Sequence, residues 1–298
     1  MPVGVTVTRT AAAGSLFPIP VPSASYFVVG LAQRGSATEV VRVTSLAAFE
    51  AAFGARPSYG NLYDDLAMFF SEGGGEAYIA RVVGPAATEG SLATALVDRA
   101  GTPLSTLQVT AKGPGAWSSD VTVEVANGTI TNTFTLIVRY QGTEVERFPN
   151  LTSPAAAVTE TAGSQWIKVT NLASATAAPN NNPAVSGPTA LAAGTDDRAS
   201  VTSTHLVNAL ARFGPQYGEG AVAIPGGGDA THAGLITHAE ANNRTAILAS
   251  APGNTCSQLA TLGHGRSRIR VGARWSPPVD FTALSRSPGD GRGAPLSR

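Results

Sequence analysis

The sequence predicts an α/β protein in which one discontinuous α/β core domain, residues 25–85 with 191–255, is interrupted by a β-rich domain at 86–190. Helical and strand periods alternate in the two outer segments, whereas the middle segment has short alternating apolar stretches separated by turn signals. An isolated alternating stretch near the N-terminus adds an extended strand arm within residues 1–24.

The composition is that of a globular chain with a substantial core. Hydrophobic residues make up 43% of the 298 residues, and the formal net charge is zero. Zero charge gives no reason to expect nucleic acid as a partner. No apolar run approaches the roughly 18 residues of a membrane span. The single cysteine, Cys256, cannot form an internal disulfide, which fits a reducing compartment.

The N-terminal arm consists of a strand followed by a stiff, proline-rich linker. One face of the alternating stretch VGVTVTR carries Val3, Val5 and Val7. The linker prolines, which hold the chain extended, are Pro18, Pro20 and Pro22. A lone strand needs a sheet to satisfy its backbone groups. It therefore either joins the sheet of a neighbouring copy or closes the sheet of its own domain.

The first α/β segment reads strand, helix, helix, strand. YFVVGL is a buried strand, residues 45–53 and 61–72 have helical spacing, and AYIARVV is the second strand. Ser45 or Thr44 suits the first helix start, and Gly73 to Gly75 suit the second helix end. The aromatic residues expected to pack in this core are Phe49, Phe53, Phe69, Phe70 and Tyr78.

The middle segment predicts a small sandwich or barrel. After a short helix expected near residues 90–98 come the strand-like stretches LQVTA, VTVEVA, FTLIVRY and WIKVT, separated by turns such as Asn-Gly and Gln-Gly. Residues 175–188, rich in Asn, Pro and Ala, are expected to form a mobile surface loop. The α/β pattern then returns as helix, strand, a helix capped by Asp229, and strand, which implies parallel pairing.

No stretch of the sequence predicts an active site. His232 and His238 lie six apart on an expected helix and do not share a face, so they suggest no metal site. IPGGGDATH has glycines but lacks the Lys-Ser/Thr of a phosphate loop. Trp117 and Trp166 are expected to be packing residues. We therefore expect no catalytic, cofactor-binding or metal-binding residues, and a structural rather than an enzymatic role.

Four stretches, in this order, resemble the contractile-tail sheath proteins of bacteriophages and related contractile injection systems. They are VGVTVTR with FPIPVPSASYFVVGLAQRG, VRVTSLAAFEAAFG with LYDDLAMFFSEGGGEAYIARVV, LQVTAKGPGAWSSDVTVEV, and LAAGTDD with VNALARF and AVAIPG. The similarity covers roughly residues 1–252. It implies a sheath-type core domain with an inserted protruding domain.

The resemblance also implies a function. Sheath subunits stack as six-membered rings around an inner tube, then contract and drive the tube through a target envelope. The implied partners are other copies of the chain, the inner tail tube protein, and baseplate and terminator proteins. The implied location is a virion tail assembled in the bacterial cytoplasm. The alternatives are another virion component, such as a baseplate or decoration protein, and an α/β enzyme.

The last segment, residues 256–298, departs from the sheath pattern, which continues with a further domain and a second arm. From His264 onward it holds seven arginines among many Gly, Pro and Ser residues, and it lacks apolar periodicity. One interpretation is a basic arm for an acidic surface or nucleic acid. The interpretation we favour is a truncated or frame-shifted end of a GC-rich gene.

Translation of the coding DNA in the other two frames beyond codon 255 tests this interpretation. We expect one frame to continue with an α/β pattern of alternating helical and strand periods. If neither frame does, the frame shift is wrong.

Overall fold

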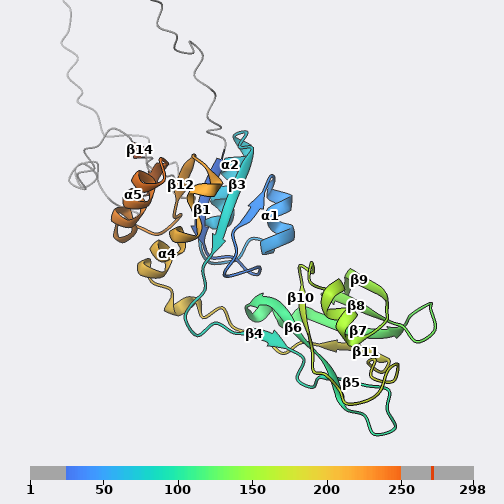
Figure 1. The fold of residues 1–298 in the computed structure, drawn as a ribbon. Helices are drawn as coiled ribbons and strands as arrows, with labels where there is room; N and C mark the ends of the chain where they lie inside the picture. Colours follow the sequence, from blue (N-terminus) through green and yellow to red (C-terminus); the bar gives the residue numbers. More distant parts are fainter. Residues whose placement is uncertain (1–24, 250–269, 272–298) are drawn as a thin grey trace, which may run out of the picture.

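The computed structural model describes residues 25–249 and the backbone of residues 270–271. The predicted arm residues Val3, Val5 and Val7, the three linker prolines, and nearly all of the C-terminal tail therefore lie outside the described residues. The described chain forms two units, an α/β unit and a β-rich unit, that meet end to end (Figure 1).

The α/β unit is built on a six-stranded sheet. Its strands are β1 (Ser25–Gly30), β2 (Val41–Val43), β3 (Glu76–Arg81), β12 (Ala221–Ala223), β13 (Thr245–Leu248) and β14 (Arg270–Val271). They lie in the order β14-β13-β12-β1-β3-β2. All neighbouring pairs are parallel except β2 with β3. The parallel pairing that the sequence predicted is confirmed.

Helices cover both faces of this sheet (Figure 1). They are α1 (Leu46–Phe53) and α2 (Leu62–Ser71) on one face, and α4 (Ser203–Ala209) and α5 (His232–Ala241) on the other. The central strand β1 is buried throughout, with Tyr26 and Val28 facing α1 and α2 and with Phe27 and Val29 facing α4 and α5. The result is a three-layer α/β/α unit with a core on each side of the sheet.

The aromatic residues predicted for the core occupy both faces. Phe49 and Phe53 are fully buried and stack with ring centroids 5.1 Å apart. Phe69 and Phe70 are partly buried and pack against the same cluster. Tyr78 packs on the opposite face of the sheet, with its ring centroid 5.2 Å from that of Phe27.

The helix ends agree with the sequence in two of three places. Ser45 caps α1, with its hydroxyl accepting from the backbone nitrogen of Ala48 at 3.1 Å. Gly73 follows α2 with a φ of 88°, the left-handed geometry expected of it. The predicted cap of α5 is wrong: Asp229 lies in a 3-10 turn (Asp229–Thr231), and the helix begins only at His232. The tighter turn precedes the helix because the Thr231 nitrogen bonds to the Gly228 carbonyl.

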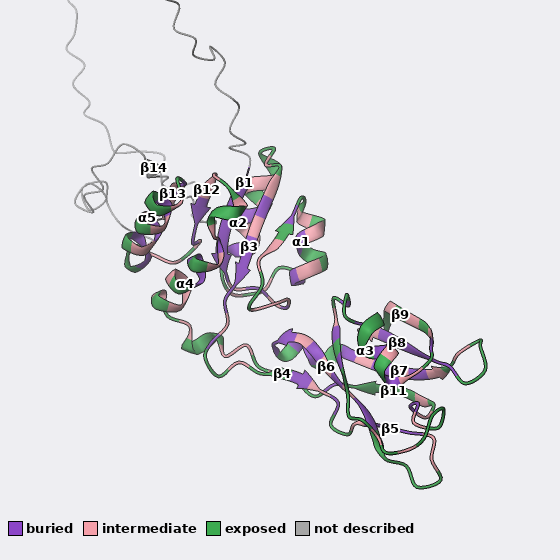
Figure 2. Cartoon of the chain, in the orientation of Figure 1, coloured by how far each residue is buried: buried purple, intermediate pink, exposed green. Residues whose placement is uncertain are grey.

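The β-rich unit is a sandwich of two antiparallel sheets. Its elements are β4 (Glu89–Ser91), β5 (Leu96–Val97), β6 (Ser105–Pro114), β7 (Val121–Asn127), β8 (Phe134–Tyr140), β9 (Thr143–Leu151), α3 (Pro154–Glu160), β10 (Ile167–Asn171) and β11 (Ser186–Ala190). One sheet has the order β10-β6-β4, with β5 also on β6, and the other β11-β7-β8-β9. Inward-facing residues of both sheets form one shared core, visible as buried strands in Figure 2.

One expectation for this unit is wrong. The helix expected near residues 90–98 is replaced by β4 and β5, both paired with β6, because Leu92 and Leu96 enter the sandwich core. The loop expected at 175–188 lies mostly at the surface, as predicted, but not throughout. Asn182 is fully buried, its side-chain nitrogen donates to the Asn132 carbonyl at 2.8 Å, and the segment runs directly into β11.

Short 3-10 turns complete the described chain, at Ala116–Asp120, Arg198–Ser200, Leu210–Arg212 and Pro215–Tyr217 besides Asp229–Thr231. Within the described part of the chain no helix has the length and apolar character needed to cross a membrane.

The glycine turn between α2 and β3 leads to a prediction about stability. A Cβ on Gly74 would lie 2.4 Å from the ring of Phe69, which is itself packed 4.8 Å from Tyr26. Because the rigid ring has little room to move, Gly74→Ala is expected to lower the free energy of unfolding by about 1–3 kcal/mol. Gly163→Ala, where no atom lies within 4 Å, is the control. Equal urea midpoints for the two variants would contradict this packing.

Candidate functional site: the joint between the two units

The two units are joined around one buried guanidinium, that of Arg81 at the end of β3. Its Nε donates to the Ala32 carbonyl at 3.0 Å and its Nη1 to the Gly35 carbonyl at 2.8 Å. Its Nη2 crosses to the β-rich unit and donates to the Pro114 carbonyl at 2.9 Å. Burial lowers the pKa of Arg81 to about 10, so the side chain remains charged near neutral pH. The Arg81 side chain thus connects strand β3 with residues 32–35 and with Pro114.

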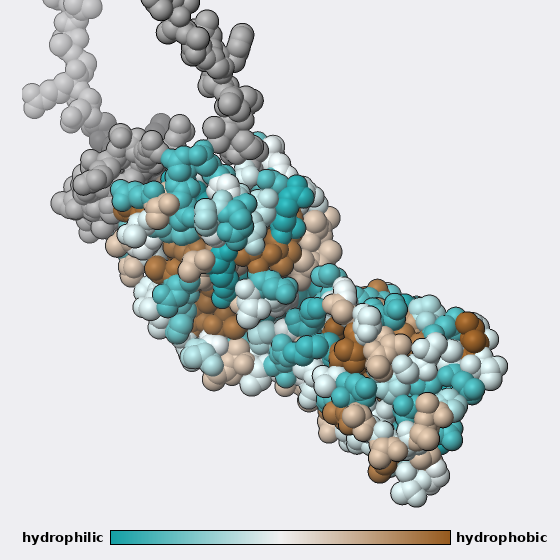
Figure 3. All heavy atoms as spheres, viewed as in Figure 1, coloured by the Kyte–Doolittle hydropathy of each residue, from teal (hydrophilic) through white to brown (hydrophobic). Residues whose placement is uncertain are grey.

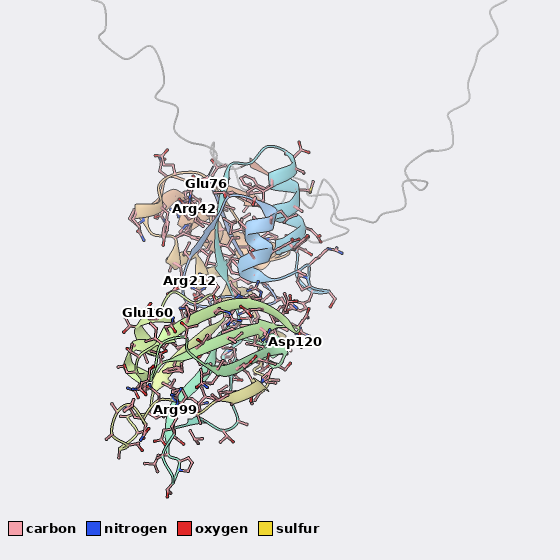
Figure 4. The ribbon with its side chains drawn as sticks, turned by 90° about the vertical axis from the view of Figure 1, so that its right-hand side faces the viewer. Arg42, Glu76, Arg99, Asp120, Glu160 and Arg212 are labelled. Carbon is pink, nitrogen blue, oxygen red and sulfur yellow. The ribbon has the colours of Figure 1, made fainter. Side chains whose placement is uncertain are left out.

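A further hydrogen bond holds the backbone of Arg81. Arg212 donates from Nη1 to the Arg81 backbone carbonyl at 2.7 Å. Figure 4 shows Arg212 close to the boundary where the α/β unit meets the β-rich unit. Both the backbone and the side chain of Arg81 are therefore fixed by neighbours.

A second buried arginine, Arg34, makes a contact of a different kind across the joint. Its Nη2 donates to the Glu50 and Ala51 carbonyls near the end of α1. Its guanidinium carbon lies 4.0 Å from the ring centroid of Trp166, in the β-rich unit. Burial lowers the pKa of Arg34, and the nearby Tyr140 opposes that shift. Helix capping on one side and cation–π stacking on the other couple the two units.

The aromatic side of this contact is a small cluster in the β-rich unit. Trp166 lies 4.7 Å from Tyr140 and 6.1 Å from Trp117, measured between ring centroids. Trp117 donates from Nε1 to the same Pro114 carbonyl that Arg81 binds. Trp117 and Trp166 are packing residues, as the sequence predicted, and they pack at the joint.

The two segments that connect the units run side by side and pair with each other. Thr88 and Thr195 exchange both backbone hydrogen bonds, at 2.8 and 3.0 Å. The Gly84 nitrogen bonds to the Asp196 carbonyl, and the Asp197 carboxylate accepts from the Ala86 nitrogen at 2.9 Å. The pKa of Asp197 is lowered, first by that backbone hydrogen bond. The connection is thus a paired ribbon and not two independent linkers.

Two glycines allow the backbones to approach this closely. A Cβ on Gly113 would lie 2.4 Å from the Gly35 carbonyl oxygen, and one on Gly194 would lie 2.3 Å from the Thr88 carbonyl oxygen. Both clashes would be with backbone, which cannot rotate away. These glycines belong to the AKGPGAW and GTDD stretches singled out in the sequence.

The joint brings together residues from all four of those stretches, which are far apart in the chain. Gly35 comes from the first stretch, Arg81 from the second, Pro114 from the third and Asp196 from the fourth. Sequence reasoning did not assign a role to Arg34 or Arg81. One feature of the sequence does point to Arg81: it stands at the end of an apolar strand, where burial of an unpaired charge costs free energy.

The sequence analysis suggested no metal site at His232 and His238, because the two histidines do not share a helix face. His232 is buried, with its Nε2 3.0 Å from the Ala249 carbonyl oxygen. His238 lies on the other side of α5, with Nε2 2.9 Å from a guanidinium nitrogen of Arg244. Burial, followed by the charge of Arg244, lowers the pKa of His238. Among residues 25–249 no three His, Cys, Asp or Glu side chains are arranged to hold a metal ion.

Replacement of Arg81 tests the joint. Arg81→Met fills similar space but removes the donor to the carbonyls of Ala32 and Gly35 and leaves the Pro114 carbonyl with Trp117 alone. We expect the free energy of unfolding, measured in urea, to fall by about 3 kcal/mol or more. The control is Arg56→Met, since Arg56 only pairs with Asp64 at the surface and its loss should leave the midpoint unchanged. A midpoint for Arg81→Met equal to that of the wild type would refute the role of the clamp.

Comparison with solved structures identifies the fold. A sheath tail protein from Listeria innocua matches with a TM-score of 0.55 and 15% identity, over 77% of this chain and 48% of that one. A sheath tail protein from Desulfitobacterium hafniense matches with a TM-score of 0.50 and 16% identity, over 84% of this chain and 53% of that one. The chain thus spans about half the length of the sheath tail structures it matches.

No protein-family model and no curated protein matches the sequence. The likeness therefore lies in the arrangement of the elements, in agreement with the resemblance carried by the four stretches. This chain has the fold of sheath tail proteins.

Proposed function

We propose that this chain is a structural subunit of a contractile tail sheath. The observation that carries the proposal is the match over 77% of the chain to a sheath tail protein, together with the convergence of the four resembling stretches at one joint. In this role the chain forms no covalent bonds with a substrate. It works through contacts with other copies of itself, stacked as rings around an inner tube, in a virion tail.

The proposed domain division follows the two units. Residues 25–85 with 191–255 serve as the core domain, and residues 86–190 serve as the protruding domain inserted into it. The paired connection and the Arg81 clamp favour movement of both domains as one rigid body. A subunit of that kind can rotate between two packings of the assembly without unfolding.

Assembly is proposed to proceed through the N-terminal arm. The strand of Val3, Val5 and Val7 adds to a sheet edge of a neighbouring copy, with the linker of Pro18, Pro20 and Pro22 as an extended spacer. The edge strands β9 and β11 of the sandwich contain Pro149 and Pro188, which disfavour strand addition there. We propose that the acceptor edge lies on the core domain. The inner tube, baseplate and terminator proteins are the further proposed partners.

Deletion of residues 1–10 tests the arm. We expect negative-stain electron microscopy to show rings or striated tubes for the full chain and only single particles for the deletion. Thermal unfolding of the deletion should match that of the full chain, since the two described cores of the α/β unit use residues between 26 and 248, none of which the deletion removes. A deletion that still polymerises into normal tubes would show that the arm model is wrong.

Point substitutions provide a matched pair within the arm. Replacement of Val3, Val5 and Val7 by threonine keeps strand propensity but removes the apolar face, and should weaken assembly. The control replaces Thr6 and Thr8, on the opposite face, by serine, and should leave assembly intact.

A further inference from the structure

A buried arginine of the α/β unit, Arg244, binds the segment that leads into β12. Its Nε donates to the Gly218 carbonyl at 3.0 Å, and its Nη2 donates to the Gly214 carbonyl at 2.9 Å. Its Nη1 donates to the Phe213 carbonyl at 2.6 Å. Because Arg244 stands directly before β13, these three hydrogen bonds connect residues 213–218 with the sheet.

The Nη1 atom of Arg244 has a second partner, the imidazole of His238 on α5. The Nε2 atom of His238 lies 2.9 Å from this Nη1. A guanidinium donates hydrogen bonds and accepts none, so Nε2 is the acceptor. An imidazole accepts at Nε2 only when it is neutral and carries its proton on Nδ1. The contact therefore requires an uncharged His238.

His238 lies where water can reach it. Its side chain is only partly buried, whereas Arg244 is 3% exposed. Figure 1 shows α5 at the side of the α/β unit away from α1. The surface around α4 and α5 in Figure 3 has hydrophilic residues beside hydrophobic ones, as expected of helices with one face in solvent. A proton can therefore reach His238 while the unit stays folded.

Among the described residues, no carboxylate favours a charged His238. Burial, and then the charge of Arg244, lowers the pKa of His238, and no acidic group opposes these two effects. Several titratable groups lie on α5, on the described elements packed against it, or on the residues that lead into β12. They are Arg212, Arg244, Asp229, Glu219, Glu240, Tyr217, His205 and His232. A proton on His238 would therefore be opposed by Arg244 and balanced by none of the acids.

Protonation of His238 places a second cation against Arg244. The added proton occupies the lone pair of Nε2, so the hydrogen bond from Nη1 is lost and two N–H groups face each other. Like charges at this separation repel, more strongly where water is partly excluded. We propose that His238 and Arg244 form an acid-sensitive latch, in which neutral His238 keeps Arg244 on residues 213–218 and protonated His238 releases them.

The latch lies next to the joint between the two units. Arg212, which binds the Arg81 carbonyl, directly precedes residues 213–218 in the chain. The inference goes beyond the proposed sheath role and uses none of the contacts between copies. It makes the α/β unit sensitive to acid at one helix and one turn.

The direction of the pH effect follows from the lowered pKa of His238. When the latch opens, the imidazole regains the ordinary histidine pKa of 6.5 and takes up a proton more readily than in the closed latch. The closed form is therefore favoured above pH 6.5, and the open form gains population as the pH falls below that value.

Hydrogen–deuterium exchange of the full chain at about pH 7.5 and about pH 5.5 tests the latch. The rates are corrected for the intrinsic effect of pH on exchange. We expect amides of residues 213–218 to exchange about three- to tenfold faster at the lower pH, because proton uptake raises the population of the open form by about that factor. In His238→Gln, whose side-chain oxygen is a neutral acceptor for Arg244 at both pH values, the acceleration should disappear.

The matched control is His205→Gln, which removes a different histidine of the same face of the sheet. His205 accepts from the Thr202 nitrogen through Nδ1, and glutamine at this position of a helix keeps such a capping contact. This variant should respond to acid as the wild type does.

A nuclear magnetic resonance titration of the assigned His238 ring in the wild type gives a second measurement. We expect a midpoint below 6.5. If His238 titrates and exchange in residues 213–218 does not change, the imidazole swings away alone and the latch is wrong. Equal acceleration in the wild type and in His238→Gln would also overturn it. If His238→Gln does not fold, the wild-type titration and the wild-type exchange still decide the proposal.

Discussion

The charged hydrogen bonds of Arg81 are the contact on which the architecture depends. A guanidinium removed from water requires acceptors for its donors, and here the acceptors are backbone carbonyls of both units. The β-rich unit therefore cannot rotate away from the α/β unit without exposing or orphaning several polar groups at once, and the paired connection at Thr88 and Thr195 opposes the same movement.

This constraint gives the proposed sheath role a physical basis. A subunit that transmits force must keep its shape while its contacts with neighbours change. The clamp, the Arg34–Trp166 stacking and the glycine-permitted approach of Gly113 all act to make two separately packed units behave as one body. We propose that the adaptable part of the assembly is the N-terminal arm.

Much of the fold could be predicted from the sequence, because it is encoded locally. Apolar periodicity predicted α1, α2 and the long strands, and the cap of Ser45 and the left-handed Gly73 set boundaries correctly. The short strands β4 and β5 could not be predicted, since only pairing with β6 makes them strands. The role of Arg81 was missed for the same reason: its acceptors come from distant segments, and no local pattern reports them.

Arg81 is expected to fix the orientation of the β-rich unit relative to the α/β unit, and double electron–electron resonance measures this orientation. Spin labels at Ala51→Cys and Ala155→Cys, both exposed, place one label on α1 and one on α3 in a Cys256→Ser background. We predict a single narrow distance distribution, broadened when Arg81 is replaced by Met. An equally broad distribution with and without Arg81 would contradict the account.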